Sequence, residues 1–434
     1  MRILYLTPRP LWPGRRGDQV RTAGLALGLA RRHRVTILSQ RWSGDPAGPP
    51  PGASLEPASE DAAAAAAGLE VREVLVPRLA VAWQGARGAV AGVWGSPRPI
   101  QAALYDAPAF RRAVLEEVER TAPDVVILTL SRLGSLEPAL RGIPVVVDLI
   151  DALGANMRRR AERQPALGWL WEREARRLEV WEAELIERSA LATVVAERDR
   201  LALEKARRPA KLAGGGRLEV VPFGLDVPGG LPARPEGSRE KETVALTGNL
   251  GYFPTRDAAR WFASGAWPAL RAARPGCRWL IAGARPGPPM ERLAREAGRG
   301  VTLIADPPSL HDLLARATVS IAPLFAGSGT PIKILEAMAL GVPVVTTPRG
   351  AAGLDALPPG AVAVAEDAGD FARAVEALLA SPERRRQQAD LAFRWLRGRH
   401  HLPRVAERFE ALLAATVGRT AGETAADAEG AGSP

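Results

Sequence analysis

The first half of the chain alternates short apolar runs with segments in which apolar residues recur at helical spacing. RILYLT, from Arg2, predicts a buried strand, and RVTILSQ, from Arg34, predicts a second one. Between them, QVRTAGLALGLARR, from Gln19, has the apolar spacing of an amphipathic helix. A strand, a helix and a further strand form a βαβ unit, and such units build parallel sheets.

The same rhythm runs through the rest of the chain, with one interruption. The later runs that predict buried parallel strands are DVVILTL, IPVVVDLI, TVALTG, CRWLIAG, GVTLIA, ATVSIAPL and GVPVVTT. A segment rich in Pro and Gly, from Pro228 to Gly237, separates the first two of these runs from the other five. We therefore predict an α/β chain of two Rossmann-like domains that face each other across a cleft.

The predicted domain limits follow this interruption and the loss of pattern near the end of the chain. Residues 1–222 form the first domain and residues 223–395 form the second. Residues 396–414 are helical and basic, and we expect them to pack back on the first domain. Residues 415–434 have no apolar face, which predicts a disordered tail.

The composition fits two packed domains in a reducing compartment. The chain has 434 residues, of which 47% are apolar, and one hydrophobic core rarely supports so many. The single cysteine, Cys277, lies in an apolar run, which favours a buried thiol in a cytoplasmic protein. The N-terminus is typical of a first strand rather than of a secretory signal, and no run reaches the ~20 apolar residues of a transmembrane helix. A peripheral position on the inner face of the plasma membrane stays open.

The formal net charge of +10 indicates an anionic partner. Residues 2–41 hold nine arginines against one acid, Asp18. An anionic membrane surface and a phosphate-bearing substrate both fit such a patch. Nucleic acid is not expected, because no aromatic and basic ladder, zinc spacing or recognition helix accompanies the charge. The segment from Leu79 to Trp94 is mildly apolar, and core packing is its favoured interpretation, with contact to a membrane interface as the alternative.

The stretch SIAPLFAGSGTPIKILEAMALGVPVV, from Ser320 to Val345, holds the strongest chemical signal. It predicts a buried strand, a loop with Gly327 and Gly329, and a helix that begins near Pro331. Glycines let a ligand approach the backbone, and the first turn of a helix offers N–H groups with a partial positive charge, which suit a diphosphate. An ordinary strand-to-helix turn is the alternative interpretation of the glycines.

Two charged residues follow on the same predicted helix. Lys333 adds a full positive charge beside the helix start, and Glu336 lies one turn further among Ile, Leu, Ala and Met. An unpaired carboxylate in such surroundings is costly, so Glu336 needs a partner. Ribose hydroxyls are one candidate, and Lys333 itself, three residues earlier, is the other.

Candidate residues in the first half follow two of the predicted strands. Gly14 and Gly17 would let the loop after the first strand approach a phosphate or an acceptor, with a plain turn as the alternative. Asp148 and Asp151 end a buried strand, where open α/β sheets bind ligands. We assign Asp151 an acid/base or positioning role, with capping of the next helix as the alternative. The histidines lack metal-ligand spacing, so no metal site is expected.

The stretch from Ser320 to Val345 resembles the donor-binding segment of glycosyltransferase family 4, whose members have the two-domain fold called GT-B. Further resemblances follow the family's order along the chain: RPLWPGRRGDQVRTAGLALGLARRHRVTILS at the N-terminal Gly loop, VVPFGLD at the domain crossing, and LTGNLGYFPTRDAARWF with WLIAGARP at the start of the second domain. Together they reach from residue 1 to about residue 400, and their order is more specific than any single motif. Within the family the chain looks similar to bacterial sugar transferases of exopolysaccharide and exosortase-associated systems.

The resemblance implies a retaining transferase that moves a hexose-type sugar from a nucleoside diphosphate to a hydroxyl of a glycan or a lipid-linked acceptor, in the synthesis of a cell-surface polysaccharide or glycoconjugate. The first domain would hold the acceptor and the second the nucleotide-sugar, a co-substrate; no cofactor and no metal are implied. A degenerate transferase that acts as an assembly scaffold and a sugar-nucleotide epimerase of the same fold are the alternatives. A dehydrogenase is disfavoured, because no G-x-G-x-x-G follows the first strand.

The resemblance also assigns roles where residues match the family's motifs. Glu336 corresponds to the second glutamate of a paired-glutamate motif and would hold the nucleotide ribose. The first glutamate, which contacts the transferred sugar in the family, is replaced by Ser328, and this departure puts donor identity and catalytic strength in doubt. For the diphosphate, GNLGYFPTR offers only Arg256, which leaves more of that task to Lys333. The expected donor-binding residues are Glu336, Lys333, Gly327, Ser328, Gly329, Thr330, Pro331, Ile332, Gly248, Asn249, Arg256, Gly14 and Gly17.

Overall fold

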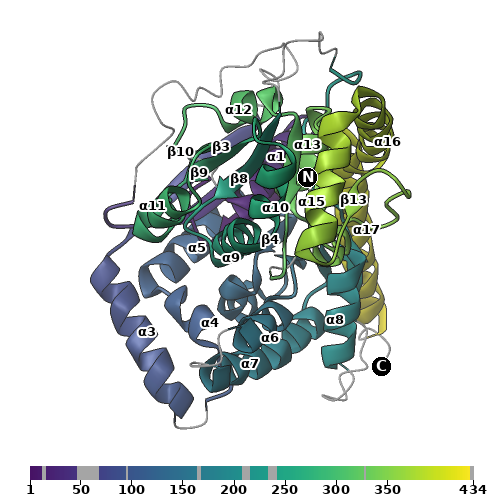
Figure 1. The fold of residues 1–434 in the computed structure, drawn as a ribbon. Helices are drawn as coiled ribbons and strands as arrows, with labels where there is room; N and C mark the ends of the chain where they lie inside the picture. Colours follow the sequence, from purple (N-terminus) through teal and green to yellow (C-terminus); the bar gives the residue numbers. More distant parts are fainter. Residues whose placement is uncertain are drawn as a thin grey trace. The chain divides into compact units, whose positions relative to one another are not determined.

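The computed structural model describes residues 1–11, 16–45, 68–93, 96–163, 168–207, 216–232, 242–326 and 329–430. Contacts between Cα atoms divide the chain into two compact units (Figure 1). Unit 1 comprises Met1–Gly224 and Leu402–Pro434, and unit 2 comprises Leu225–His401. The domain limits predicted from the sequence are residues 222 and 395.

Unit 1 is built on a parallel sheet of seven strands in the order β3-β2-β1-β4-β5-β6-β7. The strands are β1 (Arg2–Thr7), β2 (Arg34–Trp42), β3 (Leu69–Val76), β4 (Val125–Thr129), β5 (Val145–Ile150), β6 (Leu191–Val194) and β7 (Leu218–Val220). Residues of the central strands β1, β4 and β5 are buried on both faces of the sheet, as their runs of Val, Ile and Leu predict.

Helices cover both faces of this sheet. They are α1 (Gly17–Ala30), α3 (Arg78–Val93), α4 (Ile100–Leu104), α5 (Pro108–Thr121), the 3₁₀ helix η1 (Ser131–Leu140), α6 (Leu153–Arg163), α7 (Gly168–Arg188), α8 (Glu197–Arg207) and α17 (Leu402–Gly430). The side chains of β1 alternate between two core clusters. Leu4 and Leu6 join the cluster that includes residues of α5, whereas Ile3 and Tyr5 join the cluster that includes residues of α1 and α17.

A buried ion pair ties α1 to the middle of the unit 1 sheet. Arg21 of α1 donates to both carboxylate oxygens of Asp148, at 2.8 and 3.0 Å, and both side chains are 0% exposed. Arg21 also donates to the carbonyl oxygen of Pro222 at 2.9 Å, and the Thr193 hydroxyl donates to Asp148 at 2.8 Å. Buried charges need such partners. Asp148, one of the two aspartates at the end of a predicted strand, therefore has a structural role here.

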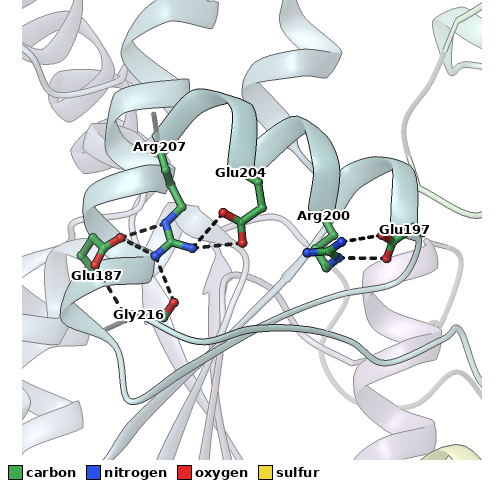
Figure 2. Close-up of polar contacts among 6 residues, drawn as sticks. All are labelled: Glu187, Glu197, Arg200, Glu204, Arg207 and Gly216. Atoms are coloured by element: carbon green, nitrogen blue, oxygen red, sulfur yellow. Dashed lines mark hydrogen bonds and ion pairs between the residues drawn. The ribbon is translucent and has the colours of Figure 1, made fainter. Parts of the chain in front are cut away.

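A second charged cluster holds the end of α8 (Figure 2). Arg207, the last residue of α8, donates to Glu187 of α7 at 2.8 Å and to both carboxylate oxygens of Glu204 at 3.1 Å. It also donates to the carbonyl oxygen of Gly216 at 3.0 Å, and the N–H of Gly216 donates to Glu187 at 3.3 Å. The cluster joins α7 and α8 to the backbone that leads into β7. Its charged side chains pair with one another.

The C-terminal helix α17 belongs to unit 1 and packs against α1. A Cβ atom built on Gly28 of α1 would lie 2.5 Å from the Cβ of Ala406, so the two helices approach closely there. Near the end of α1, Glu410 accepts a hydrogen bond from Arg32 at 3.1 Å. The sequence predicts a packed helix over 396–414 and a disordered tail over 415–434. In the structure residues 396–400 lie in α16 (Pro382–His400), and α17 continues beyond residue 414.

Unit 2 repeats the architecture with a parallel sheet of six strands in the order β10-β9-β8-β11-β12-β13. The strands are β8 (Thr243–Asn249), β9 (Arg278–Ala284), β10 (Val301–Ala305), β11 (Val319–Ala322), β12 (Val344–Thr346) and β13 (Ala363–Val364). The other helices are α9 (Phe253–Trp261), the π-helix η3 (Phe262–Ala266), α10 (Trp267–Ala273), α11 (Gly287–Glu296), α12 (Leu310–Arg316), α13 (Ile332–Ala339), α14 (Pro348–Ala351) and α15 (Ala368–Ala380). Two parallel sheets with their helices confirm the predicted α/β fold with two Rossmann-like domains.

The core of unit 2 gathers aromatic side chains between the sheet and its helices. The ring of Phe262 lies 4.8 Å from that of Trp279 and 5.9 Å from that of Phe371, measured between centroids. Cys277 is buried in the same core, as its apolar surroundings in the sequence predict. Across both units, none of the helices in the described part of the chain is long and apolar enough to span a bilayer.

Candidate functional site

The carboxyl ends of two neighbouring strands lie at one edge of the unit 2 sheet. β8 ends at Asn249, and β11, its parallel neighbour, ends at Ala322. The chain then returns to this edge as α13, whose residues contact β11. Open parallel sheets bind their ligands at the carboxyl ends of the strands. The described donor-binding residues predicted for unit 2 lie on the end of β8, in the loop that precedes α13, and on the helices α9 and α13.

Lys333, in the first turn of α13, reaches across to the start of α9. Its Nζ donates a hydrogen bond to the Thr255 hydroxyl at 3.1 Å. The side chain is partly buried, and burial lowers the pKa of Lys333 to about 8, an effect that the negative charge of Glu336 opposes. The ammonium group thus loses water and gains one hydrogen bond from the described residues, although it has three N–H donors.

Glycines make room for this ammonium group where β8 and β9 end. Gly248 has a φ of +130°, and a Cβ there would lie 3.2 Å from the Nζ of Lys333. Gly283 has a φ of +155°, and a Cβ there would lie 1.7 Å from the carbonyl oxygen of Gly248. A side chain at either position would therefore displace the strand ends or the ammonium group. Asn249 accepts a hydrogen bond from the N–H of Gly251 at 3.0 Å and so shapes the turn after β8.

Glu336 lies one turn further along α13. Its side chain is partly buried, and no described residue donates a hydrogen bond to its carboxylate. Burial raises the pKa of Glu336 to about 7, and the positive charge of Lys333 opposes this shift. Within the described residues the two side chains form no direct ion pair. The structure therefore favours a carboxylate without a partner among the described residues over the alternative in which Glu336 forms an ion pair with Lys333.

The start of α13 adds backbone donors to these two charges. Pro331 is the N-cap residue and Ile332 the first helical residue, and no side chain among the described residues caps the helix. The first N–H groups of an uncapped helix need acceptors and carry a partial positive charge. Backbone donors, an ammonium group and a carboxylate so arranged suit a ligand with an anionic group and neighbouring hydroxyls.

The loop between β11 and α13 is described in part. Gly327 and Ser328, two of the predicted donor-binding residues, lie outside the described residues. Gly329, with a φ of +66°, and Thr330 are both buried. The Thr330 hydroxyl oxygen is buried without a hydrogen-bond partner among the described residues, although buried polar atoms normally have one.

Arg256 directly follows Thr255 in α9, and neighbouring residues of a helix point to different sides. It lines a hollow of about 490 Å³ between α9 and α11, together with Arg260 and Arg292. Lys333 does not line this hollow, whereas its partner Thr255 directly precedes Arg256. A role of Arg256 in phosphate binding stays a prediction.

Two of the candidate residues of unit 1, Gly17 and Asp151, follow strands of its sheet. Gly17 is the first residue of α1, which follows β1, and Gly14 lies outside the described residues. Asp151 follows β5 directly and is partly buried. Its N–H donates to the carbonyl oxygen of Leu149 at 2.7 Å, and the intervening Ile150 has a φ of +65°. The backbone therefore turns sharply at the point where Asp151 leaves the sheet.

Glu182 of α7, which the sequence analysis missed, lies beside this turn. Its carboxylate accepts hydrogen bonds from the N–H groups of Leu153 at 3.0 Å and Gly154 at 3.1 Å, so it caps α6 from another helix. Burial raises the pKa of Glu182 to about 8, and the negative charge of Asp151 adds to the shift. In the sequence, Glu182 stands out only as an acidic residue at helical spacing from the apolar residues of α7. This pattern does not reveal that its partners are N–H groups of α6.

A comparison with known protein families gives a match within unit 2. Residues 241–381, most of unit 2, match the family described as Glycosyl transferases group 1. No curated protein sequence matches the chain. The match covers the strand ends, α9 and α13 described above, and it supports a group 1 glycosyltransferase.

Solved structures with a similar fold cover nearly the whole chain. Sucrose-phosphate synthase from Thermosynechococcus elongatus has a TM-score of 0.68 at 16% identity, over 95% of this chain and 98% of its own. Anabaena HepE in complex with UDP and glucose has a TM-score of 0.66 at 12% identity, over 96% and 100%. WaaG, a glycosyltransferase involved in lipopolysaccharide biosynthesis, has a TM-score of 0.60 at 16% identity, over 95% and 99%. At these identities the similarity concerns the fold alone, and it confirms the predicted GT-B fold.

Proposed function

We propose that this chain is a retaining glycosyltransferase of family 4 that transfers a sugar from a nucleoside diphosphate to a hydroxyl of a glycan or a lipid-linked acceptor. The observation that carries the proposal is the pair Lys333 and Glu336 on the first turns of α13. Both side chains are partly buried. Burial lowers the pKa of Lys333 and raises the pKa of Glu336, so it favours the neutral form of each group. Charged groups that the protein leaves with so few partners are typical of a site completed by its ligand.

A nucleoside diphosphate sugar supplies what both groups lack. Its diphosphate offers anionic oxygens to the Lys333 ammonium group and to the uncapped N–H groups of α13. Its ribose offers two hydroxyl donors to the carboxylate of Glu336. The fold neighbour HepE is described in complex with UDP and glucose, which supports a donor of this class for this chain.

The chemical step would depend on stabilising the departing diphosphate. As the bond from the sugar to the diphosphate breaks, negative charge grows on the leaving oxygen, and Lys333 with the α13 backbone would stabilise that charge. Retention at the anomeric carbon and the family 4 assignment are supported by the order of motifs along the sequence. Asp151, at the carboxyl edge of the unit 1 sheet, would position the acceptor hydroxyl or accept its proton.

The proposed setting is the synthesis of a bacterial exopolysaccharide or related cell-surface glycan, in the cytoplasm and at its membrane. The fold neighbour WaaG, described as involved in lipopolysaccharide biosynthesis, supports a glycoconjugate product. The buried single thiol of Cys277 is compatible with a reducing compartment.

Thermal-shift screening against UDP, GDP, ADP and their sugars tests donor binding. The full-length protein is expected to gain thermal stability with one nucleotide, because a ligand that binds only the folded state stabilises it. Glu336→Ala is expected to lose that shift, whereas Glu291→Ala, at an exposed position on α11, should keep it. An equal shift in both variants, or no shift of the unmodified protein with any nucleotide, would contradict the proposal.

Slow release of the nucleotide from the preferred donor then distinguishes transfer from the alternatives. Release of nucleotide that quickens when an acceptor is added supports a transferase. An epimerised sugar nucleotide would instead indicate an epimerase, and donor binding without any turnover would indicate a scaffold.

A further inference from the structure

Helix α3 of unit 1 carries an apolar stripe that the fold leaves uncovered. Leu79 is 85% exposed, Trp83 66% and Val90 58%. The exposed residues Ala82 and Ala86 complete the stripe, because the spacing of these five positions places them on one face of a helix. The sequence favoured core packing for this segment, and for these side chains that interpretation is wrong.

The opposite face of α3 packs against α4 and the core of unit 1. The helix is therefore held in position, and the exposure of the stripe is not the result of a detached helix. A Cβ atom on Gly85 would lie 2.7 Å from Cδ2 of Leu104 in α4, and one on Gly88 would lie 2.6 Å from Cβ of Ala103. Val81 is 5% exposed and joins the core of unit 1. In Figure 1, α3 lies at the edge of unit 1, with no described segment of that unit on its outer side. The stripe is therefore presented outward by an anchored helix.

Helix α3 and the residues next to it in the sequence carry positive charges and no negative ones. Residues 74–105 contain no aspartate or glutamate and three arginines, although acids make up 48 of the 434 residues of the chain. Arg87 lies within the helix and is exposed, while Arg78 at its start pairs with Asp45 at 3.0 Å. An acid-free apolar helix with arginine at its border has the composition of helices that rest on anionic lipid surfaces.

The size and polarity of the stripe argue against a protein partner. A helix of 16 residues is about 24 Å long, so one face about 10 Å wide offers roughly 240 Å². A stable protein interface needs roughly 800 Å² on each partner and about one hydrogen bond per 100–200 Å². Apart from the indole N–H of Trp83, the stripe has no side-chain hydrogen-bonding group. A bilayer requires neither a large area nor hydrogen bonds.

We propose that the outer face of α3 docks on the surface of an anionic lipid bilayer, with Leu79 and Trp83 entering the boundary between headgroups and acyl chains. Arg87 then lies at the level of the phosphate groups and contributes attraction that depends on lipid charge and on salt. This inference goes beyond the proposed sugar transfer, since it concerns a surface of unit 1 and requires no donor.

Co-sedimentation of the full-length protein with vesicles tests the surface in the absence of any sugar nucleotide. Binding is measured to phosphatidylcholine alone and to equal parts of phosphatidylcholine and phosphatidylglycerol. The double variant Leu79→Gln/Trp83→Gln is expected to bind the mixed vesicles at least about tenfold more weakly, because two large apolar side chains no longer enter the bilayer. Arg87→Gln should weaken binding to the mixed vesicles and leave binding to phosphatidylcholine unchanged.

The matched control is Leu201→Gln on α8, a residue that is 55% exposed in the same unit. This variant should bind like the unmodified protein, and the melting temperatures of all variants should agree because every changed side chain is exposed. Unchanged vesicle binding by the double variant overturns the proposal. So does a concentration-dependent dimer that the double variant abolishes, which would assign the stripe to a second copy. Loss of the nucleotide-induced thermal shift in Glu336→Ala is a separate readout, so failure of one proposal is distinguishable from failure of the other.

Discussion

Replacement of Glu336 by glutamine should stabilise the ligand-free protein, and increasingly so as the pH rises. Burial raises the pKa of this carboxyl from 4.5 to about 7, so the folded state binds the proton more tightly than the unfolded state does. The free energy of unfolding of the unmodified protein is therefore expected to fall as the pH rises from 4.5 through 7. The shift corresponds to about 3 kcal/mol, which we reduce to about 2 kcal/mol because the side chain is only partly buried. Glutamine has nearly the same shape and does not ionise.

Urea denaturation followed by tryptophan fluorescence between pH 5 and pH 8.5 measures this difference. Glu336→Gln should differ little from the unmodified protein at pH 5 and should be more stable by about 2 kcal/mol above pH 7.5. Glu291→Gln, an exposed position on α11, controls for the loss of one negative charge and should show no such trend. A Glu336→Gln variant that is equally stable at all pH values, or less stable at pH 8, would refute the reasoning that this carboxylate lacks partners.

Three further predictions concern the stability of the two units. Lys333→Met should stabilise the ligand-free protein at pH 7, with an advantage that shrinks between pH 8 and 10.5 because burial lowers the pKa of Lys333 to about 8; urea midpoints across this range measure it. Gly283→Ala should lower the free energy of unfolding by about 3 kcal/mol, since its Cβ would lie 1.7 Å from a carbonyl oxygen, whereas Gly398→Ala, with open space around it in α16, should gain about 0.5 kcal/mol in the same assay. Arg21→Met should cost about 3–5 kcal/mol in chemical denaturation by leaving Asp148 buried and unpaired, and Arg21→Met with Asp148→Leu should recover much of that loss.

The fold was predictable from the sequence where strands are buried on both faces. Runs such as RILYLT and TVALTG stand out because a parallel strand between two layers of helices excludes polar residues. Two edge strands, β3 and β13, were not predicted, whereas the edge strand β10 was predicted from its run GVTLIA. β3 (Leu69–Val76) alternates apolar and charged residues and is only partly buried, and β13 (Ala363–Val364) has two residues. These two strands lack the continuous apolar run on which the other predictions relied.

The candidate site was predictable to the extent that it is local in sequence. Lys333 and Glu336 share one helix, so their spacing alone places them near each other. The contact of Lys333 with Thr255 spans 78 positions and depends on how α9 leaves β8, which no local pattern contains. The same holds for Glu182, whose two hydrogen bonds join α7 to the start of α6. Long-range polar contacts follow from packing, and packing is decided by the whole core.

Two pairs of charged side chains in this chain differ in how many hydrogen bonds the protein gives them. Arg21 and Asp148 are fully buried, yet each has several hydrogen bonds from the protein, so the pair is complete and a ligand has nothing to add. Lys333 has one hydrogen bond and Glu336 has none from the described residues, although burial shifts the pKa of both. A folded protein that retains such a cost must offset it by stabilising interactions elsewhere. Burial alone therefore does not distinguish the ion pair that holds α1 to its sheet from Lys333 and Glu336. What distinguishes them is how many hydrogen bonds the described residues give each pair, and this difference is the reason for the proposal that Lys333 and Glu336 bind a ligand.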